Sequence, residues 1–119
     1  PLAGYLQLAQ GLYQQGPAFA GAWNFGPADA DMCSVGEVVE RLARRWPQAP
    51  GLRIEPSELH EAGLLRLDSS RARQLLGWRP RWSLDDCLEQ ALDWHLAWRR
   101  GEDMRTFSLA QLTAYRGGQ

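Results

Sequence analysis

The sequence predicts a small α/β protein that is mostly helical, with about five helices and two or three short strands. Three observations lead to this class. Apolar residues recur at helical spacing in five segments. Capping residues precede most of these segments and glycines or prolines follow them, as is typical of helix starts and ends. Two further short segments have alternating apolar residues bounded by glycine or proline, which is typical of strands.

The N-terminal part is expected to contain one helix and one strand. Apolar spacing predicts a helix over residues 2–13, which Gly16 and Pro17 end. No capping residue precedes this helix, so the chain is expected to begin inside an element of a larger fold. Residues 19–27, FAGAWNFGP, have alternate aromatic side chains and a Gly-Pro end, which predict a short strand.

The second helix is the most clearly marked element. Ser34 and Glu37 have the spacing of a capping box, in which each side chain accepts a hydrogen bond from an otherwise unpaired backbone N–H. An apolar stripe then predicts a helix over residues 35–46, which Pro47 ends. Residues 52–56 are expected to form a second short strand. If the two strands pair in parallel, their crossover is right-handed.

Two more helices are predicted in the C-terminal half. Asp68 or Ser69 caps a short helix that ends at Gly77. Ser83 begins another capping pattern, and the longest helix is predicted over residues 84–100. Because its apolar residues cover much of its circumference, this helix is expected to be the central and most buried one.

A last helix is predicted over residues 108–115, where Ser108 and Gln111 again have the spacing of a cap. The few short strands cannot make a sizeable sheet by themselves, and such strands normally pack beside other structure. The chain is therefore expected to form one domain, residues 1–119, that looks like half of a larger fold.

The composition is that of an ordinary globular protein. Apolar residues make up 45% and charged residues 23% of the 119 positions. No apolar run approaches the roughly 18 residues of a membrane span, and no signal segment opens the chain, so a cytoplasmic location is expected. The net charge of −1, with scattered basic residues, argues against nucleic acid as a main partner.

Lysine is absent from the sequence, and all 13 basic residues are arginine. Mechanisms that need a lysine, such as a Schiff base or a Tyr-Lys proton relay, therefore cannot run on this chain alone. The sequence also has no G-x-S-x-G elbow, no G-x-G-x-x-G motif and no phosphate loop. A self-contained enzyme is not expected, and no catalytic residue is assigned.

Candidate ligands and stacking residues are few. Cys33, His60, Cys87 and His95 lack the local pairing of structural zinc sites, so no metal site is predicted. The strings WRPRW and WHLAWRR suggest arginine stacked on indole, either to hold the two segments together or to bind a base. Packing in the core is the favoured role of the tryptophans, because a buried indole removes a large area from water.

His60 and Glu61 are the candidate binding residues. His95 lies on the longest predicted helix and is interpreted as a packing residue. His60 and Glu61 instead lie in a predicted loop, and loops on a rigid scaffold carry binding groups more often than helix stripes do. From the residues alone, the pair is either part of a site or the solvated edge of a small domain.

Two strings resemble a known family. GAWNFGP, residues 21–27, and the segment from HEAGLL to GEDMR, residues 60–105, resemble the C-terminal substrate-binding region of CDP-glucose 4,6-dehydratases. These are NAD-dependent epimerase/dehydratases of the extended short-chain dehydrogenase/reductase superfamily. The string D-x-S…LGW-x-P is shared across the superfamily, whereas HEA and GEDMR point to the narrower family. The resemblance covers essentially the whole chain but only about the last third of such an enzyme.

The resemblance implies the C-terminal lobe of an extended short-chain dehydrogenase/reductase fold, without its N-terminal NAD-binding Rossmann domain. That domain would supply the glycine-rich loop, a Tyr-x-x-x-Lys pair and an Asp-Glu acid/base pair. The fragment alone is therefore expected to bind no cofactor and to be inactive. The parent enzyme would use NAD to convert CDP-glucose to CDP-4-keto-6-deoxy-glucose, a lyase reaction of polysaccharide biosynthesis.

The resemblance also implies roles for particular residues. His60 and Glu61 match the family's loop against the nucleotide end of the substrate. His60 would donate a hydrogen bond to a diphosphate oxygen, and Glu61 would accept one from a ribose hydroxyl or orient His60. Asn24 and Gly26 match a structural motif beneath the pocket, and Arg71 is expected to brace a local turn.

The implied partners are a nucleotide sugar of the CDP-glucose type and the missing Rossmann lobe. Self-association is a further expectation, because an uncovered docking surface would be apolar. No nucleic acid or membrane partner is expected. Two alternatives stay open: a stand-alone, non-enzymatic module that binds a nucleotide or a protein, and a lobe for a UDP, dTDP or GDP sugar.

Overall fold

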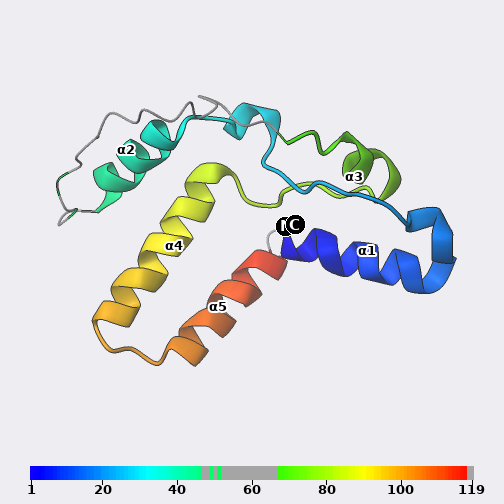
Figure 1. Ribbon diagram of the computed structural model, residues 1–119. Coiled ribbons are helices and arrows are strands. Elements are labelled where there is room, and N and C mark those ends of the chain that lie inside the picture. The colour runs from blue at the N-terminus through cyan, green and yellow to red at the C-terminus, as the bar shows by residue number, and fades with distance from the viewer. Residues whose placement is uncertain (47–48, 50, 52–66, 118–119) are drawn as a thin grey trace. The chain divides into compact units, whose positions relative to one another are not determined.

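The computed structural model describes residues 1–46, 49, 51 and 67–117 (Figure 1). The chain divides into two compact units, residues 1–32 with 65–80 and residues 33–64 with 81–119. The mostly helical class is confirmed. In chain order the helices are α1 (Leu2–Gln15), α2 (Val35–Arg45), α3 (Ser70–Leu75), α4 (Leu84–Arg99) and α5 (Met104–Gly117), with short 3₁₀ turns at Gly16–Phe19 and Asp29–Asp31.

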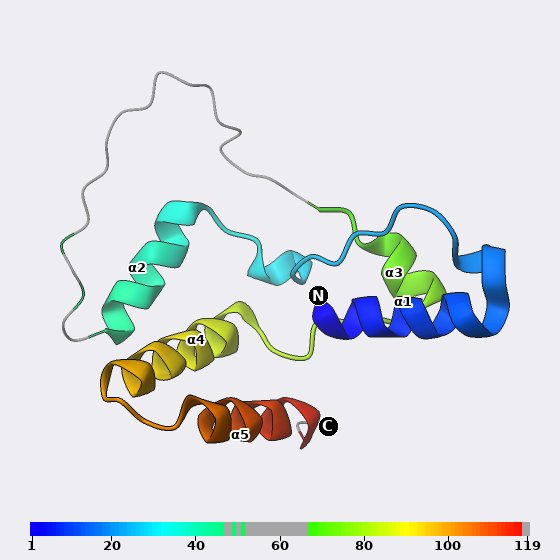
Figure 2. The ribbon, with the colours of Figure 1, turned by 60° about the horizontal axis from the view of Figure 1, so that its bottom comes forward.

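The predicted strand over residues 19–27 is wrong, and no strand occurs in the described ranges. After the 3₁₀ turn the segment runs as irregular extended chain past α1 and α3 (Figure 2). Its backbone groups are paired with side chains instead of a neighbouring strand. The Arg71 guanidinium donates to two of its carbonyl oxygens, and Ser69 Oγ accepts a hydrogen bond from Gly26 N–H. The second predicted strand, residues 52–56, lies outside the described residues.

Helix α1 packs against this segment through two buried glycines. A Cβ added to Gly4 would lie 2.3 Å from the ring of Phe25, and one added to Gly11 would lie 3.2 Å from the ring of Phe19. The two glycines are seven residues apart, which places them on one face of the helix. Gly16, with φ of 59°, ends the helix as predicted, because this left-handed conformation suits a residue without a side chain.

The core of the first unit is aromatic. Phe25, Ala72 and Trp78 are buried together. The ring of Phe25 makes edge-to-face contacts with Tyr5 and Trp78, with ring centres 5.3 and 5.1 Å apart. Such contacts add to the gain from burying the rings, so Phe25 is the residue that joins α1 to the segment after α3.

Helix α3 begins and ends as its sequence predicts. Asp68 Oδ1 accepts a hydrogen bond from Ser70 N–H at 2.8 Å, so Asp68 performs the local capping. Gly77 has φ of 62°, and this turn lets Trp78 N–H donate to the carbonyl of Ala72 at 3.1 Å. The glycine therefore turns the chain so that the Trp78 ring enters the core.

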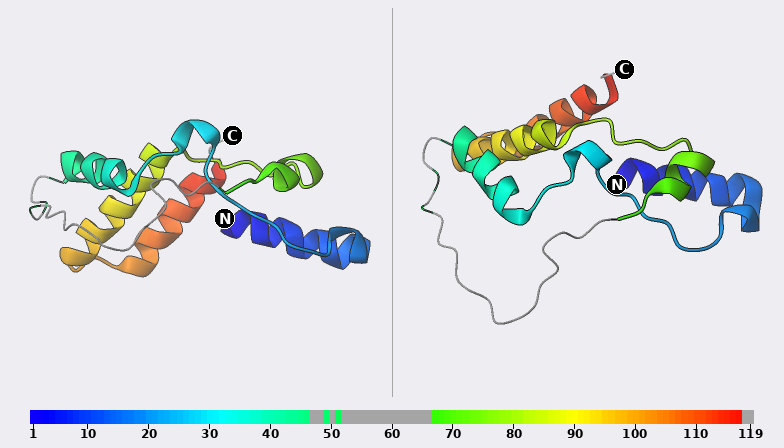
Figure 3. Two further views of the ribbon diagram at one scale, coloured as in Figure 1. Left: turned by 45° about the horizontal axis from the view of Figure 1, so that its top comes forward. Right: turned by 90° about the horizontal axis from the view of Figure 1, so that it is seen from above.

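In the second unit, α4 contacts both α2 and α5 (Figure 3). The predicted capping boxes at the starts of α2 and α4 are both present. In each, the serine hydroxyl accepts from the backbone N–H three residues later, and the carboxylate of that later residue accepts from the serine N–H. The residue pairs are Ser34 with Glu37 and Ser83 with Asp86.

Helix α4 is central to the second unit, as predicted, although few of its residues are buried in the described structure. Leu92 and Ala97 are its buried residues. Packing against α2 and α5 leaves part of the surface of α4 open within the described part of the chain. Trp94 is 39% and Trp98 57% exposed. The exposed apolar side chains follow one stripe: Cys87, Ala91, Trp94 and Trp98.

Helix α5 begins earlier than predicted. Its cap is Asp103, whose Oδ1 accepts from Arg105 N–H at 3.0 Å and whose Oδ2 accepts from the Thr106 hydroxyl at 2.6 Å. Ser108, the predicted cap, lies inside the helix, where its hydroxyl accepts a hydrogen bond from Trp94 Nε1 at 3.0 Å. The serine thus joins α5 to α4 instead of starting a helix.

Candidate functional site

The predicted binding residues, His60 and Glu61, lie outside the described residues. The structure does describe the chain that follows them and its attachment to residues 24–26. Asn24 Nδ2 donates to the carbonyl of Asp68 at 3.2 Å, and Gly26 N–H donates to Ser69 Oγ at 2.8 Å. We call residues 24–26 and 67–71 the anchor.

The anchor is tightly packed at Gly26. Ser69 is only 1% exposed, so its hydroxyl and the Gly26 N–H pair away from water. A Cβ on Gly26 would lie 3.1 Å from Leu67 Cβ and 3.3 Å from Ser69 Oγ, which is closer than ordinary van der Waals contact. The structural role expected for Asn24 and Gly26 is therefore confirmed by their contacts.

Arg71 braces the turn after α1, as expected. Its guanidinium donates to the carbonyl oxygens of Ala22 at 2.9 Å and Ala20 at 3.0 Å. The same group lies 4.2 Å from the ring centre of Trp23, a cation–π contact. Because the planar guanidinium is held by two carbonyls and one ring, it is committed to the fold and is not a candidate phosphate ligand.

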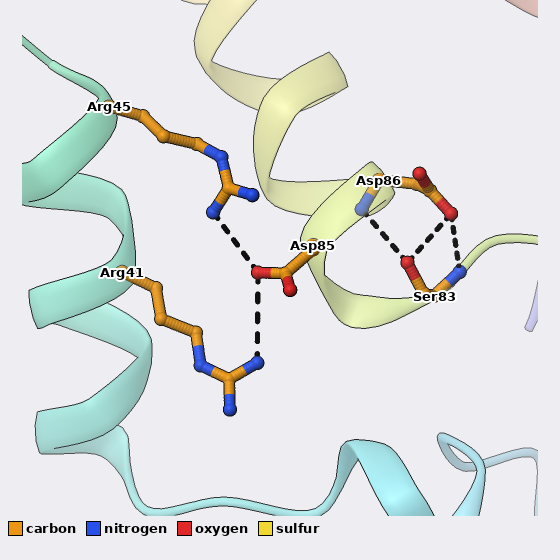
Figure 4. A network of polar contacts seen from close by, with 5 residues as sticks. All are labelled: Arg41, Arg45, Ser83, Asp85 and Asp86. Carbon is orange, nitrogen blue, oxygen red and sulfur yellow. Dashed lines mark hydrogen bonds and ion pairs between the residues drawn. The ribbon is translucent and has the colours of Figure 1, made fainter.

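Three charged residues join α2 to α4 in the second unit (Figure 4). Asp85 Oδ1 lies 3.0 Å from Arg45 Nη1 and 3.6 Å from Arg41 Nη1. Asp85 is in the first turn of α4, where a negative charge also interacts favourably with the helix dipole. The three side chains are between one third and one half exposed, so the pairing sets orientation more than stability.

The starts of four helices carry ionised carboxylates. The pKa of Glu37 is lowered because the backbone N–H and then the hydroxyl of Ser34 donate hydrogen bonds to it. The pKa values of three aspartates are lowered mainly by hydroxyl donors. These aspartates and their donors are Asp68 with Ser70, Asp86 with Ser83, and Asp103 with Thr106.

The carboxylates at the helix starts make these positions unfavourable for binding anions. A helix N-terminus binds phosphate when its backbone N–H groups are free and the local charge is positive. At α2, α4 and α5 the side chain of a capping carboxylate already accepts N–H hydrogen bonds. These helix starts are therefore poor sites for a diphosphate group.

His95 is a packing residue, as predicted. Its ring lies 5.2 Å from that of Trp46 and 5.7 Å from that of Trp98. The Nε1 of Trp46 is buried without a hydrogen-bond partner in the described structure. The rings touch one another directly, so this cluster joins α2 to α4.

The predicted stacking of arginine on tryptophan between WRPRW and WHLAWRR is not seen in the described residues. Arg81 lies over the ring of Tyr115 instead, at 5.5 Å, and Trp82 packs edge-on against the same ring at 4.9 Å. These contacts join the start of α4 to the end of α5.

An open groove of about 420 Å³ lies between α4 and α5. Its polar groups are largely used: Gln111 Nε2 donates to the carbonyl of Gln90 at 2.7 Å, and Trp94 Nε1 donates to Ser108. The groove contains no charged side chain, so it suits an apolar surface better than a nucleotide. The apolar spacing in the sequence identified Cys87, Ala91 and Trp94 as one face of the helix, but it predicted that this face is buried. The lining residues are Trp82, Cys87, Gln90, Ala91, Trp94 and Gln111.

Within the described ranges, no group of three or more His, Cys, Asp or Glu side chains is placed to hold a metal ion. None of the described helices is both long and apolar enough to cross a membrane.

No protein-family model matches the chain. A CDP-glucose 4,6-dehydratase from Salmonella typhimurium is 42% identical to it over 116 residues, which cover 97% of this chain and 32% of the relative. The chain therefore spans about a third of the length of the curated relative that it matches. The resemblance inferred from the sequence motifs is confirmed by this alignment.

Proposed function

We propose that this chain is a nucleotide-sugar-binding lobe of an enzyme similar to CDP-glucose 4,6-dehydratase, and that it is not catalytic by itself. The observation that carries the proposal is the 42% identity to such an enzyme over 97% of the chain. The chain matches 32% of the relative, so we assign catalysis and the binding of NAD to the remainder of such an enzyme. The substrate would be CDP-glucose and the product CDP-4-keto-6-deoxy-glucose.

In this proposal His60 and Glu61 contact the nucleotide end of the substrate. A histidine N–H can donate to a diphosphate oxygen, and a carboxylate can accept from a ribose hydroxyl or orient the histidine. The anchor supports the proposal because a binding loop needs a rigid attachment, and Leu67 follows His60 by only seven residues.

The described residues do not fit a dinucleotide cofactor. A Rossmann site needs a glycine-rich turn and a helix start whose N–H groups face the pyrophosphate. The sequence lacks the glycine motif, and at the starts of α2 and α4 a serine hydroxyl accepts a first-turn N–H while a carboxylate in that turn adds negative charge. We therefore assign no NAD contact to this chain.

A nucleotide titration followed by amide NMR tests the proposal. CDP at millimolar concentration is expected to shift the signals of His60, Glu61 and the anchor. Binding should be weak, with Kd about 1 mM, because contacts from the rest of the enzyme are missing. His60→Ala should abolish the shifts. His95→Gln is the matched control, since His95 packs against Trp46 and Trp98 and has no role in the proposed site.

The other outcomes separate the alternatives. If UDP, dTDP or GDP shifts the same amides while CDP does not, the assignment of the base is wrong. If CDP shifts amides of the α4–α5 groove and not those near His60, the assignment of the site is wrong. If no nucleotide has an effect, the stand-alone module with a protein partner replaces the proposed lobe.

A further inference from the structure

We draw no further inference here: the strongest candidate, the exposed apolar face of helix α1 formed by Leu2, Leu6 and Tyr13, belongs to a chain that spans 32% of its relative, and nothing in the structure shows what covers it.

Discussion

Replacing Gly4 by alanine tests whether the packing of α1 on Phe25 determines the stability of the first unit. An added Cβ would lie 2.3 Å from Phe25 Cδ1, against a normal carbon–carbon separation of about 3.5–4.0 Å. The ring would have to move by more than about 1 Å. It is only 7% exposed, and the rings of Tyr5 and Trp78 contact it edge-to-face. The clash therefore cannot be relieved by turning one flexible side chain.

Gly11→Ala is the matched control, because Gly11 is buried on the same face of α1. Its Cβ would lie 3.2 Å from Phe19 Cγ, and Phe19 is only half-buried, so a small movement of the ring relieves the contact. Each substitution gains about 1 kcal/mol of helix propensity. Gly11→Ala should therefore be neutral or stabilising by up to about 1 kcal/mol.

At Gly4 the clash opposes the gain in helix propensity. Overpacking costs about 1–3 kcal/mol, and the 2.3 Å approach places Gly4→Ala at the upper end of that range. A net loss of about 1–2 kcal/mol in the free energy of unfolding is expected. Urea unfolding, followed by far-UV circular dichroism and by tryptophan fluorescence, measures both variants. If Gly4→Ala is as stable as Gly11→Ala, the described packing of α1 on Phe25 is refuted.

Two further substitutions test the anchor and a helix cap. Ser69→Ala leaves the Gly26 N–H without its acceptor, at a cost of about 1–3 kcal/mol. Hydrogen exchange at the Gly26 amide should therefore accelerate about tenfold or more. An unchanged exchange rate would contradict the described packing of the anchor. Hydrogen bonds from Ser83 lower the pKa of Asp86, so its contribution to stability is present above the ordinary pKa of 3.8 and disappears as the pH falls through the lowered value. As the pH is lowered, helix content should fall less steeply in Asp86→Asn than in the wild type. The control Asp93→Asn should follow the wild-type curve. If Asp86→Asn also follows the wild-type curve, the cap at Asp86 does not depend on its charge.

The starts of α2 and α4 were predicted correctly because their whole interaction lies within a few residues. A capping box closes between positions three apart, so Ser34 with Glu37 contains all the information needed for the start of α2. The start of α5 was mispredicted at Ser108 because the same spacing also occurs inside helices. The real cap, Asp103, bonds to Thr106, while Ser108 accepts from Trp94 on another helix. Local spacing cannot distinguish a serine that caps a helix from a serine inside a helix that bonds to another helix.

The mispredicted strand has a similar cause. Alternate aromatics in residues 19–27 indicate an extended chain, and after the 3₁₀ turn the structure contains irregular extended chain. Phe25 enters the core, while Trp23 stacks on Arg71. Whether such a chain becomes a strand depends on a neighbouring backbone to pair with, and sequence alternation does not reveal that neighbour.

The candidate site was predicted unevenly. Asn24, Gly26 and Arg71 received structural roles from the resemblance, and their hydrogen bonds agree with those roles. The α4–α5 groove was missed because apolar spacing marks a helix face without saying whether a neighbouring element covers it. Trp94, 39% exposed, lies on such a face.

The charges of the described residues limit where this chain can hold a diphosphate. Helix starts, the usual anion sites, are occupied at α2, α4 and α5 by carboxylates, of which Glu37, Asp86 and Asp103 have lowered pKa values and are therefore ionised at neutral pH. Arg71 is held by backbone carbonyls and an indole ring. A diphosphate near α2 would have to take Arg41 or Arg45 away from Asp85, and it would meet the repulsion of that carboxylate. These costs disfavour the helix starts and Arg71 as diphosphate sites, so the proposal places the nucleotide at His60 instead.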